Sequence, residues 1–530
     1  MTGRGPDAPA ADAPRVVTLL ALICVTAACA LYLWRLQDTP LAIGGDEAFF
    51  ANHGLAMATT GADLNGRRLP LVIQLDPNVD PGLWYQAMLV YLEAIAFAVL
   101  PFGEWSARLP VALLAIINIA LAWHVASRYT RLAFAGPVAA MVIALSPIYF
   151  FLSRQVVDYI CPILFVLLWL KALIALDDHA RRRDAFWCGF ILAAGLFSYV
   201  SSWLMMPVYL LCTIAFCMTK PRRWSLSLAA AAGFSVPAGA LVWWLAAHPD
   251  AWNSLVHRYA GQSIQRPGLN INGYYRLVDL VSAYWACWNP AQLFLLGSPN
   301  PIIGVRSGGV FVAPVAILFG AGLLAIARPG ARRLILLAGL LSAPLGPVFY
   351  GTPGAIQRQL VLLPFVAIVA GCGAAILWSR SWQSRLLVSL TLVACPVVFA
   401  FAAYDVFAGR EDYVTRFDPS NFRQLTPAIA ELDRQLPAPQ VVIAIGPYDR
   451  RAYWRFHATK TGNTGLRDRA VFWEPEAFRP DAVAENSLIV ASASSSLAAQ
   501  LDRGCGRVAV FRGEADVVVW RATPGCLVKP

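Results

Sequence analysis

The most constraining feature of this sequence is a series of apolar stretches, each close to 20 residues long, that recurs along most of the chain. A helix of about 20 residues spans the hydrocarbon core of a bilayer. The 530 residues are 58% hydrophobic and only 14% charged, well below the charged fraction of a soluble domain. The sequence therefore predicts a polytopic α-helical membrane protein. We expect about eleven spans, at residues 16–36, 107–127, 133–151, 158–176, 185–200, 203–218, 225–246, 308–327, 334–351, 359–379 and 386–404.

The basic residues gather in short runs between these stretches. The runs are Arg128 with Arg131, Arg181 to Arg183, Lys220 with Arg222 and Arg223, Arg328 with Arg332 and Arg333, and Arg380 with Arg385. The net charge of +11 is therefore typical of cytoplasmic loops under the positive-inside rule, and it indicates no nucleic-acid partner. A further apolar run at 84–100 must not cross the membrane, because one extra crossing would invert every later loop. We expect this run to lie in the interface or to re-enter.

This topology predicts a protein of the inner (cytoplasmic) membrane with a cytoplasmic N-terminus and a periplasmic C-terminus. Residues 1–15 are rich in Pro, Ala and Asp and are expected to be disordered. Residues 16–404 form the membrane domain. After Tyr404 the charged fraction rises and apolar runs shorten, which predicts a small α/β domain at 405–530. In this domain we expect an amphipathic helix at 421–436 and strand-like runs at 440–445, 470–473, 488–491, 508–511 and 517–520.

Asp46 and Glu47 are adjacent carboxylates placed just after the first span, on the predicted outer face. One such carboxylate can take the proton of an acceptor hydroxyl while a glycosidic bond breaks. The alternative is that both acids merely cap an interfacial helix, since acids favour helix N-termini. The same topology brings other polar residues to this face, namely Glu104, Arg108, Arg154, Asp158, Tyr199, Ser201, Ser202, the aromatic loop 248–306, Gln357 and Arg358. Ionisable groups that converge at span ends indicate a functional site.

Several short motifs occur in a fixed order around these residues. They are Gly45 to Phe49, Asp63 to Pro70, Asp80 to Tyr85, Glu104 to Leu113, Ser153 to Asp158, Gly195 to Ser202, Asn289 to Asn300 and Gln357 to Pro364. Over roughly residues 40–380 this order resembles the protein O-mannosyltransferase and aminoarabinose-transferase group of GT-C-fold glycosyltransferases. Members of this group use dolichyl- or polyprenyl-phosphate sugars. The resemblance implies a GT-C fold of about eleven transmembrane helices, with interfacial helices in the first outer loop.

The resemblance further implies transfer of a hexosyl or pentosyl group from a polyprenyl-phosphate donor to a lipid A, cell-envelope glycan or protein acceptor. We assign Asp46 as general base of an inverting displacement, with Glu47 and Asp158 as further catalytic residues. The leaving phosphate is expected to be bound by guanidinium groups, for which the candidates are Arg67, Arg68, Arg108, Arg154 and Arg358. Asp158 has an alternative role as the ion-pair partner of Arg154, four residues before it on a helix. No cofactor is expected, with a divalent ion as the alternative.

Eleven cysteines show no C-x-x-C spacing, and the six histidines include no ligand pair, so no metal cluster is indicated. Cys505 and Cys526 both lie in the polar tail and are candidates for a disulfide on an oxidising face. The rival interpretation of the chain is a lipid or solute transporter, or flippase, without transfer chemistry. Such a protein would carry ionisable groups at mid-bilayer and repeated halves, whereas here the charges lie at the span ends.

Overall fold

The computed structural model describes residues 13–76, 82–132, 134–262, 273–298, 300, 302–305, 308–327, 330–350, 355–408, 417–418, 420–445, 450–511, 516–524 and 526. The chain divides into two compact units. The first unit comprises Met1–Leu36, Leu69–Tyr91 and Leu109–Ala408, and the second comprises Gln37–Arg68, Leu92–Arg108 and Gly409–Pro530. Two stretches of the first outer loop therefore belong to the same unit as the C-terminal tail. Residues 1–12 of the predicted disordered segment lie outside the described residues, and residues 13–15 begin a helix.

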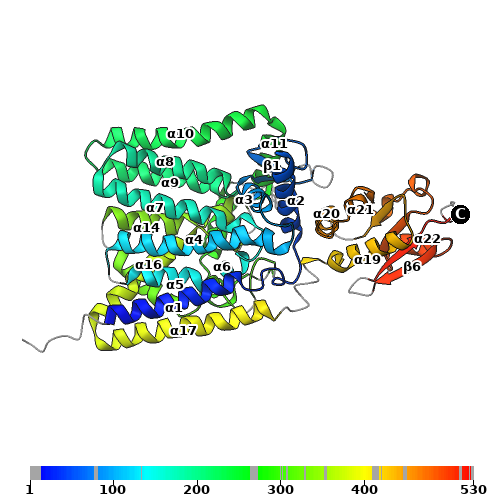
Figure 1. Cartoon of the computed structure of the whole chain (residues 1–530). Helices are drawn as coiled ribbons and strands as arrows, with labels where there is room; N and C mark the ends of the chain where they lie inside the picture. Colours follow the sequence, from blue (N-terminus) through cyan, green and yellow to red (C-terminus); the bar gives the residue numbers. More distant parts are fainter. Residues whose placement is uncertain are drawn as a thin grey trace, which may run out of the picture. The chain divides into compact units, whose positions relative to one another are not determined.

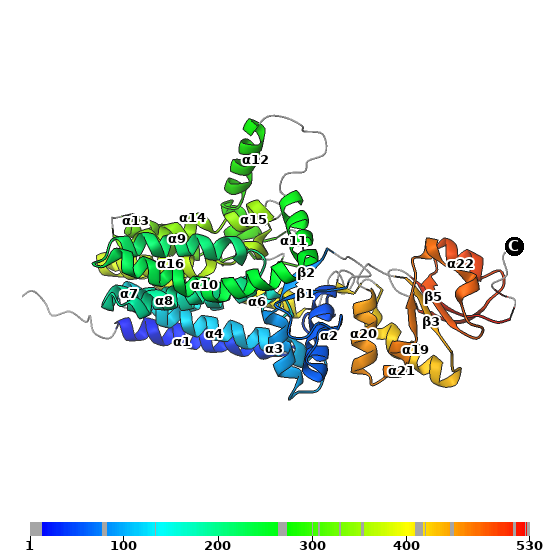
Figure 2. The same cartoon turned by 90° about the horizontal axis from the view of Figure 1, so that it is seen from above.

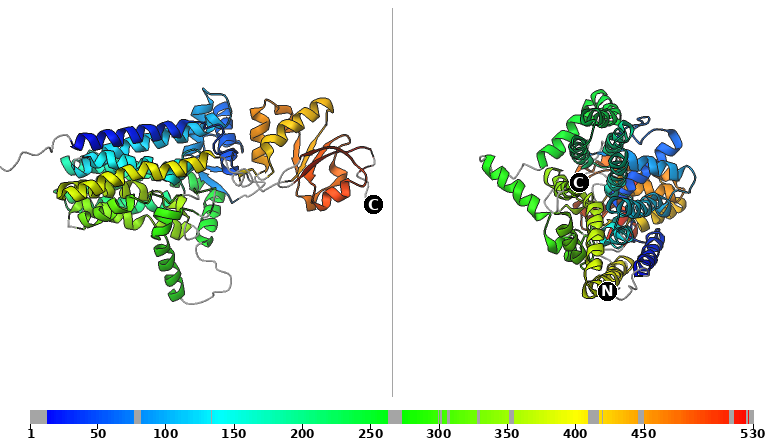
Figure 3. Two further views of the ribbon diagram at one scale, coloured as in Figure 1. Left: turned by 90° about the horizontal axis from the view of Figure 1, so that it is seen from below. Right: turned by 90° about the vertical axis from the view of Figure 1, so that its left-hand side faces the viewer.

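The first unit is a bundle of helices that run side by side (Figure 1), seen along the helices in the right-hand view of Figure 3. Its elements are α1 (Ala13–Leu33), β1 (Val72–Gln74), β2 (Trp84–Gln86), most of α4 (Glu104–Thr130), α5 (Ala135–Ala144), α6 (Pro147–Leu152), η1 (Asp158–Ile160), α7 (Cys161–His179), α8 (Arg182–Ala194), η2 (Gly195–Phe197), α9 (Ser202–Met218), α10 (Arg223–Ala247), α11 (Pro249–Gln262), α12 (Gly273–Ala286), η3 (Gln292–Leu296), α13 (Val315–Ile326), α14 (Ala331–Ser342), α15 (Leu345–Tyr350), η4 (Ile356–Arg358), α16 (Leu362–Arg380) and α17 (Trp382–Phe407).

Seven helices among the described residues are long and apolar enough to cross a membrane. They are Arg15–Leu33, Glu104–Thr130, Asp158–His179, Arg223–Ala247, Ala331–Phe349, Leu362–Arg380 and Trp382–Phe407. Each coincides with a predicted span, and the other predicted spans coincide with shorter helices. The span predicted at 133–151 is divided into α5 and α6, because Ser146 caps a new helix whose first residue is Pro147. The protein is thus a multi-pass membrane protein, as predicted.

Close packing inside the bundle depends on glycines. A Cβ atom on Gly189 of α8 would lie 1.9 Å from the carbonyl oxygen of Ala230 on α10. A Cβ atom on Gly373 of α16 would lie 1.9 Å from the carbonyl oxygen of Leu318 on α13. Small residues of this kind let helix backbones approach closely, which is a main source of helix association in a membrane. These contacts join α8 to α10 and α13 to α16.

The run predicted at 84–100 not to cross the membrane forms strand β2 and helix α3 (Met88–Phe97). A ten-residue helix is about 15 Å long, half the thickness of the hydrocarbon core. Strands β1 and β2 pair antiparallel. This segment is therefore too short to cross, as predicted. The aromatic loop 248–306 contains α11 and α12, and α12 projects from the bundle in Figure 2. Residues 263–272 of that loop lie outside the described residues.

The second unit combines α2 (Gly45–Thr60), the end of α3 and the first turn of α4 with the tail. The tail elements are α19 (Phe422–Gln435), β3 (Val441–Ala444), α20 (Arg450–Lys460), α21 (Thr464–Asp468), β4 (Ala470–Phe472), η5 (Pro475–Ala477), η6 (Pro480–Ala482), β5 (Leu488–Ser492), α22 (Ser496–Leu501), β6 (Gly506–Phe511) and β7 (Val517–Arg521). The sheet has the strand order β4-β3-β5-β7-β6. Strand β3 is parallel to β4 and β5, whereas β7 is antiparallel to β5 and β6.

The five predicted strand runs and the predicted amphipathic helix of the tail are all present. Strands β3, β5 and β7 form the middle of the sheet and are almost completely buried. Cys505 and Cys526 form the disulfide for which they were candidates. The prediction of a small α/β domain at the C-terminus is confirmed, and α20 is the one long tail helix that the sequence pattern did not predict.

Candidate active site

Helix α2 carries the adjacent acids Asp46 and Glu47 in its first turn. The helix begins after Gly44, whose extended backbone serves as the N-cap, and it ends at Gly61, which adopts a left-handed conformation with φ of 69°. The Glu47 carboxylate accepts a hydrogen bond from the Gly44 backbone N–H at 2.7 Å. Carboxylates in this position stabilise a helix N-terminus. The capping role considered for these acids is therefore real for Glu47.

Glu47 also forms a buried ion pair with Arg108, at the start of α4. Arg108 Nε lies 3.0 Å from Glu47 Oε1 and Nη2 lies 3.2 Å from Oε2, with side-chain exposures of 0% for Arg108 and 1% for Glu47. The same guanidinium donates to the carbonyl oxygens of Pro40 and Ala42, both at 2.9 Å. Four hydrogen bonds therefore tie α2, α4 and the loop before α2 together. These contacts position the start of α2, while the predicted phosphate-binding role of Arg108 and catalytic role of Glu47 stay predictions.

Asp46 is half-buried, unlike Glu47 beside it. Successive side chains on an α-helix point about 100° apart, so the two carboxylates of the pair face different surroundings. The contacts of Glu47 with Gly44 and Arg108 hold the start of α2, and with it the backbone that carries Asp46. Asp46 is thus the more exposed member of the acid pair.

The loop after α2 has a defined shape around Arg67 and Arg68. Asp63 Oδ1 accepts the backbone N–H of Arg67 at 2.9 Å, closing a tight turn. The Nδ1 atom of His53, a fully buried residue of α2, accepts the N–H of Leu64 at 3.4 Å. Arg68 is exposed and Arg67 is half-buried. The structure therefore presents two guanidinium groups on an ordered turn, and it places His53 in a structural role.

In the first unit, Arg154 caps the end of α1. Its Nη1 donates to the carbonyl oxygens of Leu31 and Tyr32 at 2.6 and 3.1 Å, and its Nη2 donates to that of Trp34 at 2.7 Å. The guanidinium carbon lies 4.8 Å from the ring centroid of Phe407. The last carbonyl groups of a helix lack intrahelical partners, and a cation there also matches the helix dipole. These contacts give Arg154 a structural role at the end of α1, and its role as a phosphate ligand stays a prediction.

Asp158 and Arg358 lie on two short 3₁₀ helices, η1 and η4, which pack against each other. Asp158 is completely buried and Arg358 is half-buried. Residues 153–157 are not helical, so the helical spacing on which the predicted Arg154–Asp158 pair depended is absent. The aromatic rings of Tyr159 and Tyr199 meet edge to face at 5.5 Å. The structure thus gathers the polar residues predicted near 158, 199 and 358 at one end of the bundle.

A family model of dolichyl-phosphate-mannose-protein mannosyltransferases matches residues 87–243. Among solved structures, the chain is similar to ArnT from Cupriavidus metallidurans bound to undecaprenyl phosphate. The TM-score is 0.62 at 14% identity, covering 97% of this chain and 99% of ArnT. The chain has the GT-C fold. The GT-C recognition from the sequence motifs is thereby confirmed.

Two other similar structures share this GT-C fold. The archaeal oligosaccharyltransferase AglB from Archaeoglobus fulgidus, in complex with an inhibitory peptide and a dolichol-phosphate, gives a TM-score of 0.51 at 14% identity; 95% of this chain and 74% of AglB are covered. The arabinofuranosyltransferase AftD from Mycobacteria gives 0.51 at 13% identity, covering 96% of this chain and 42% of AftD. A search of curated protein sequences finds no significant match.

The second unit, which holds the acid pair, also contains residues that the sequence pattern did not indicate. Lys460 of α20 pairs with Glu104 at 2.7 Å, and Asn52 of α2 donates to the carbonyl oxygen of Ala452 at 2.9 Å. These contacts connect the tail to the helices of the acid pair across several hundred residues of sequence. No local sequence pattern indicates such partners, because each pair joins residues that are several hundred positions apart.

Glu93 of α3 is another buried carboxyl group of the second unit. Glu93 is completely buried. It packs closely against α2, because a Cβ atom added to Gly54 would lie 2.4 Å from the Cβ of Glu93. Burial raises the pKa of Glu93 well above its usual value, and the charge of Glu47 adds to that shift. Among the described residues no three His, Cys, Asp or Glu side chains gather as metal ligands would; whether the site uses a metal stays a prediction.

Proposed function

We propose that this protein transfers a monosaccharide from a polyprenyl-phosphate donor to an acceptor hydroxyl, with inversion at the anomeric carbon. Its GT-C fold supports the glycosyltransferase class. ArnT bound to undecaprenyl phosphate and AglB in complex with dolichol-phosphate support a polyprenyl-phosphate donor. The sequence features of the tail and the basic loops support a reaction on the periplasmic side of the inner membrane.

The observation that carries the proposal is the ion pair between Glu47 and Arg108. A carboxylate that is completely buried and held by a guanidinium and a backbone N–H serves to fix geometry. It holds Asp46, one residue earlier, at the head of α2 with part of its surface accessible. A general base needs this combination of a fixed position and access to substrate.

In the proposed reaction, Asp46 accepts the proton of the acceptor hydroxyl as its oxygen attacks the anomeric carbon. The bond between that carbon and the phosphate oxygen breaks, and the phosphate leaves with the electron pair. One carboxylate suffices because no covalent sugar intermediate forms. The candidates for binding the phosphate remain Arg67, Arg68, Arg108, Arg154 and Arg358, of which Arg108 and Arg154 also make the structural contacts described above. Asp158 stays a candidate catalytic residue of the first unit.

The test compares Asp46→Asn with Asp38→Asn, a control in the same outer loop. Each variant and the wild type are expressed in a strain lacking the gene, and polyprenyl-phosphate sugars and surface glycans are measured by mass spectrometry. We expect the deletion strain to accumulate a sugar donor and to lose one sugar residue. Asp38→Asn should restore that residue, whereas Asp46→Asn should transfer it at least about 100-fold more slowly, the usual contribution of a general base.

Transfer by Asp46→Asn at the wild-type rate would contradict the assignment of the base. A deletion strain that lacks no sugar but shows altered distribution of a lipid or solute across the membrane would favour the transporter interpretation. The missing sugar itself identifies the donor, and the molecule that lacks it identifies the acceptor among lipid A, envelope glycan and protein.

A further inference from the structure

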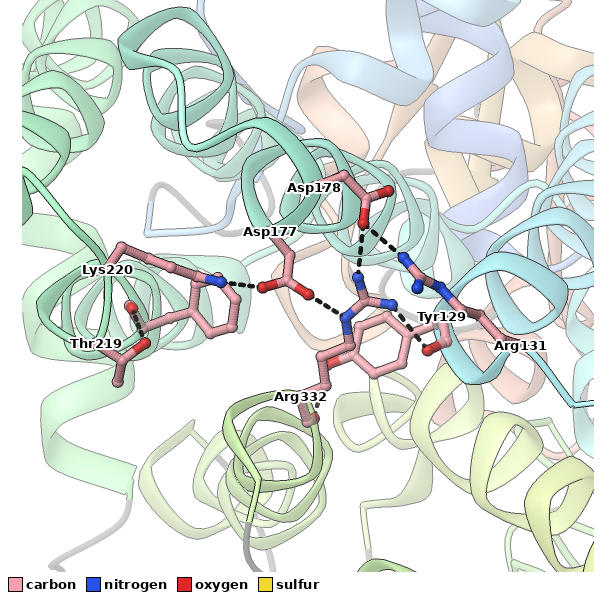
Figure 4. A network of polar contacts seen from close by, with 8 residues as sticks. Tyr129, Arg131, Asp177, Asp178, Thr219, Lys220 and Arg332 are labelled. Carbon is pink, nitrogen blue, oxygen red and sulfur yellow. Dashed lines mark hydrogen bonds and ion pairs between the residues drawn. The ribbon is translucent and has the colours of Figure 1, made fainter.

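The end of the first unit that carries the basic loops holds a network of charged side chains, shown in Figure 4. Arg332 at the start of α14 donates to Asp177 at 2.5 Å and to Asp178 at 3.1 Å, both at the end of α7. Lys220, which follows α9, pairs with Asp177, and Arg131, which follows α4, pairs with Asp178 at 2.8 Å. We call these five residues the charged network. They confirm that the basic runs after α4 and α9 and before α14 lie together.

A cavity of about 460 Å³ opens beside this network, between the ends of α4, α7, α13, α14 and α16. We call it the basic-end pocket. Its polar wall includes Arg131, Arg332, Arg333 and Thr130, with Asp177 as the one acid. Its apolar wall includes Ala325, Ile326, Leu336, Cys372 and Ile376. A cavity of this size can hold a small organic ligand or the head of a larger one.

The charges around the pocket do not balance. Asp177 and Asp178 face four cations, because Arg333 adds to Lys220, Arg131 and Arg332. Arg333 is exposed and forms no hydrogen bond or ion pair with any described residue. Arg131 is 69% exposed and has one carboxylate partner, so most of its N–H groups face solvent. The surplus charge favours an anion, and guanidinium groups favour phosphate oxygens in particular.

Arg332, in contrast, is held in place. Its Nη1 donates to the carbonyl oxygen of Tyr129 at 3.2 Å, and its own carbonyl oxygen accepts the Tyr129 hydroxyl at 2.7 Å. Its guanidinium also lies over the Tyr129 ring, at 5.7 Å. The pocket therefore combines one arginine held by several contacts, Arg332, with two exposed arginines, Arg131 and Arg333. This division is typical of a binding site and is not required of a set of structural ion pairs.

The location of the pocket decides what kind of anion it fits. Four of the helices around it, α4, α7, α14 and α16, belong to segments long and apolar enough to cross a membrane. Leu324 of α13 and Leu334 of α14, which adjoin the lining residues Ala325 and Arg333 in sequence, are 77% and 61% exposed, as lipid-facing residues are. A ligand here meets guanidinium groups at the head and apolar side chains along the bilayer. Basic pockets between transmembrane helices bind the head groups of anionic lipids.

We infer that the basic-end pocket binds the phosphodiester head group of an anionic phospholipid such as phosphatidylglycerol. Arg131 and Arg333 contact the phosphate oxygens, and the apolar wall contacts the glycerol backbone and the first part of an acyl chain. This site is distinct from the candidate active site, which uses other residues. Its ligand is not consumed, and the proposal does not depend on the proposed transferase activity.

The test measures binding of phosphatidylglycerol to the purified full chain by native mass spectrometry, as the lipid is titrated into detergent micelles. The double variant Arg131→Gln/Arg333→Gln should raise the apparent Kd of the first bound lipid by about tenfold or more, because two charge-assisted contacts are lost. The control Arg181→Gln/Arg223→Gln removes the same charge from basic loops outside the pocket and should change the Kd by less than about twofold. Both pairs are exposed, so both proteins should fold.

Two further measurements separate the pocket from general charge attraction. Ala325→Phe places a larger side chain in the apolar wall and so reduces the volume of the pocket without changing any charge. It should therefore weaken phosphatidylglycerol binding as well. Inorganic phosphate at millimolar concentration should not displace the lipid. Equal losses in the two double variants, unchanged binding by Ala325→Phe, displacement of the lipid by inorganic phosphate, or equal binding of phosphatidylcholine would each overturn the proposal.

Discussion

Glu47 and Arg108 of the second unit form an ion pair that is almost completely buried, whereas the charged network of the first unit stays in contact with water. The exposures are 1% and 0% in the pair, but 69% for Arg131 and 21% for Arg332 in the network. Both regions use arginine and carboxylate. In the buried pair, the Arg108 guanidinium donates four hydrogen bonds and the Glu47 carboxylate also accepts the Gly44 N–H. The charged network, in contrast, has three cations and two acids.

The difference shows how burial sets the role of a charged group. A buried charge must be fully partnered, and the loss of one partner is costly because the other charge stays in a low-dielectric interior. Such a pair can fix a backbone, as it does for α2, but it has little capacity left for a ligand. An exposed pair contributes little to stability because water and salt compete for both charges. Its arginines can therefore exchange one partner for another.

The largest effect on stability is expected for Arg108→Met, which leaves Glu47 buried without its guanidinium. We expect a loss of about 3–5 kcal/mol in the free energy of unfolding, measured as a large drop in the thermal unfolding midpoint at constant detergent concentration. The double variant Glu47→Leu/Arg108→Met removes both charges and should recover most of the loss. It should remain about 1 kcal/mol below the wild type, because Gly44 N–H loses its acceptor. Equal stabilities of the single and double variants would show that the charge of Glu47 does not depend on Arg108 for its stabilisation.

An intermediate effect is expected from two buried titratable groups of the tail, His457 and Asp418. Burial lowers the pKa of His457 to about 4. The negative charge of Glu104 opposes this shift, and the positive charge of Lys460 adds to it. Burial raises the pKa of Asp418 to about 6, although the Arg423 backbone N–H favours its charged form. Between pH 6.5 and 4, the unfolded chain binds a proton at His457 that the folded chain excludes. The free energy of unfolding therefore decreases as the pH is lowered through this range. Between pH 6 and 3.8, the folded chain binds a proton at Asp418 first, so stability rises as pH falls.

These two contributions are each worth roughly 3 kcal/mol and nearly cancel in the wild type. Single variants should therefore reveal them. When the pH is lowered from 7 to 4, the free energy of unfolding of Asp418→Asn should fall by roughly 3 kcal/mol relative to the wild type. That of His457→Gln should rise by a similar amount over the same range. Thermal unfolding of the full chain at pH 7, 5.5 and 4 measures both differences. Parallel pH profiles for the wild type and both variants would show that neither group titrates as its burial indicates.

The smallest effect is expected for Arg131→Gln in the charged network. Its partner Asp178 is 39% exposed and keeps Arg332, so the loss should be below about 1 kcal/mol. Added salt should reduce the difference further, because it screens exposed charges. Thermal unfolding at low and high salt checks this expectation. A loss as large as that of Arg108→Met would erase the distinction between the two regions.

Much of the fold could be predicted because it depends on local pattern. Apolar stretches near 20 residues long indicated the spans, and runs such as Gln440 to Ile445 indicated the strands of the tail. Both signals come from the segment itself, since a span must be apolar throughout and a central strand must bury both faces. The span predicted at 133–151 is broken at Ser146 and Pro147. The local signal for this break, a capping serine followed by proline, is present in the sequence, but the span was predicted as continuous.

The site was predicted less completely, because its residues act through partners far away in sequence. Asp46, Glu47 and Arg108 were all selected from the sequence, but the ion pair between Glu47 and Arg108, 61 positions apart, was not predicted. Arg154 was selected as a phosphate ligand and caps α1. No sequence pattern distinguishes an arginine that binds a ligand from one that binds a carbonyl group, since the same donors serve both.

The sequence by itself determined that this chain lies in a membrane, where its spans fall, and that an α/β domain follows them. These properties arise from the apolar surface of each segment, which the residues of that segment alone specify. Only the tertiary structure decided that parts of the first outer loop and the tail form one unit, that Glu47 belongs to Arg108, and that Asp177 lies between Lys220 and Arg332. Partner choice depends on which charges folding brings together and shields from water, and that is a property of the whole chain.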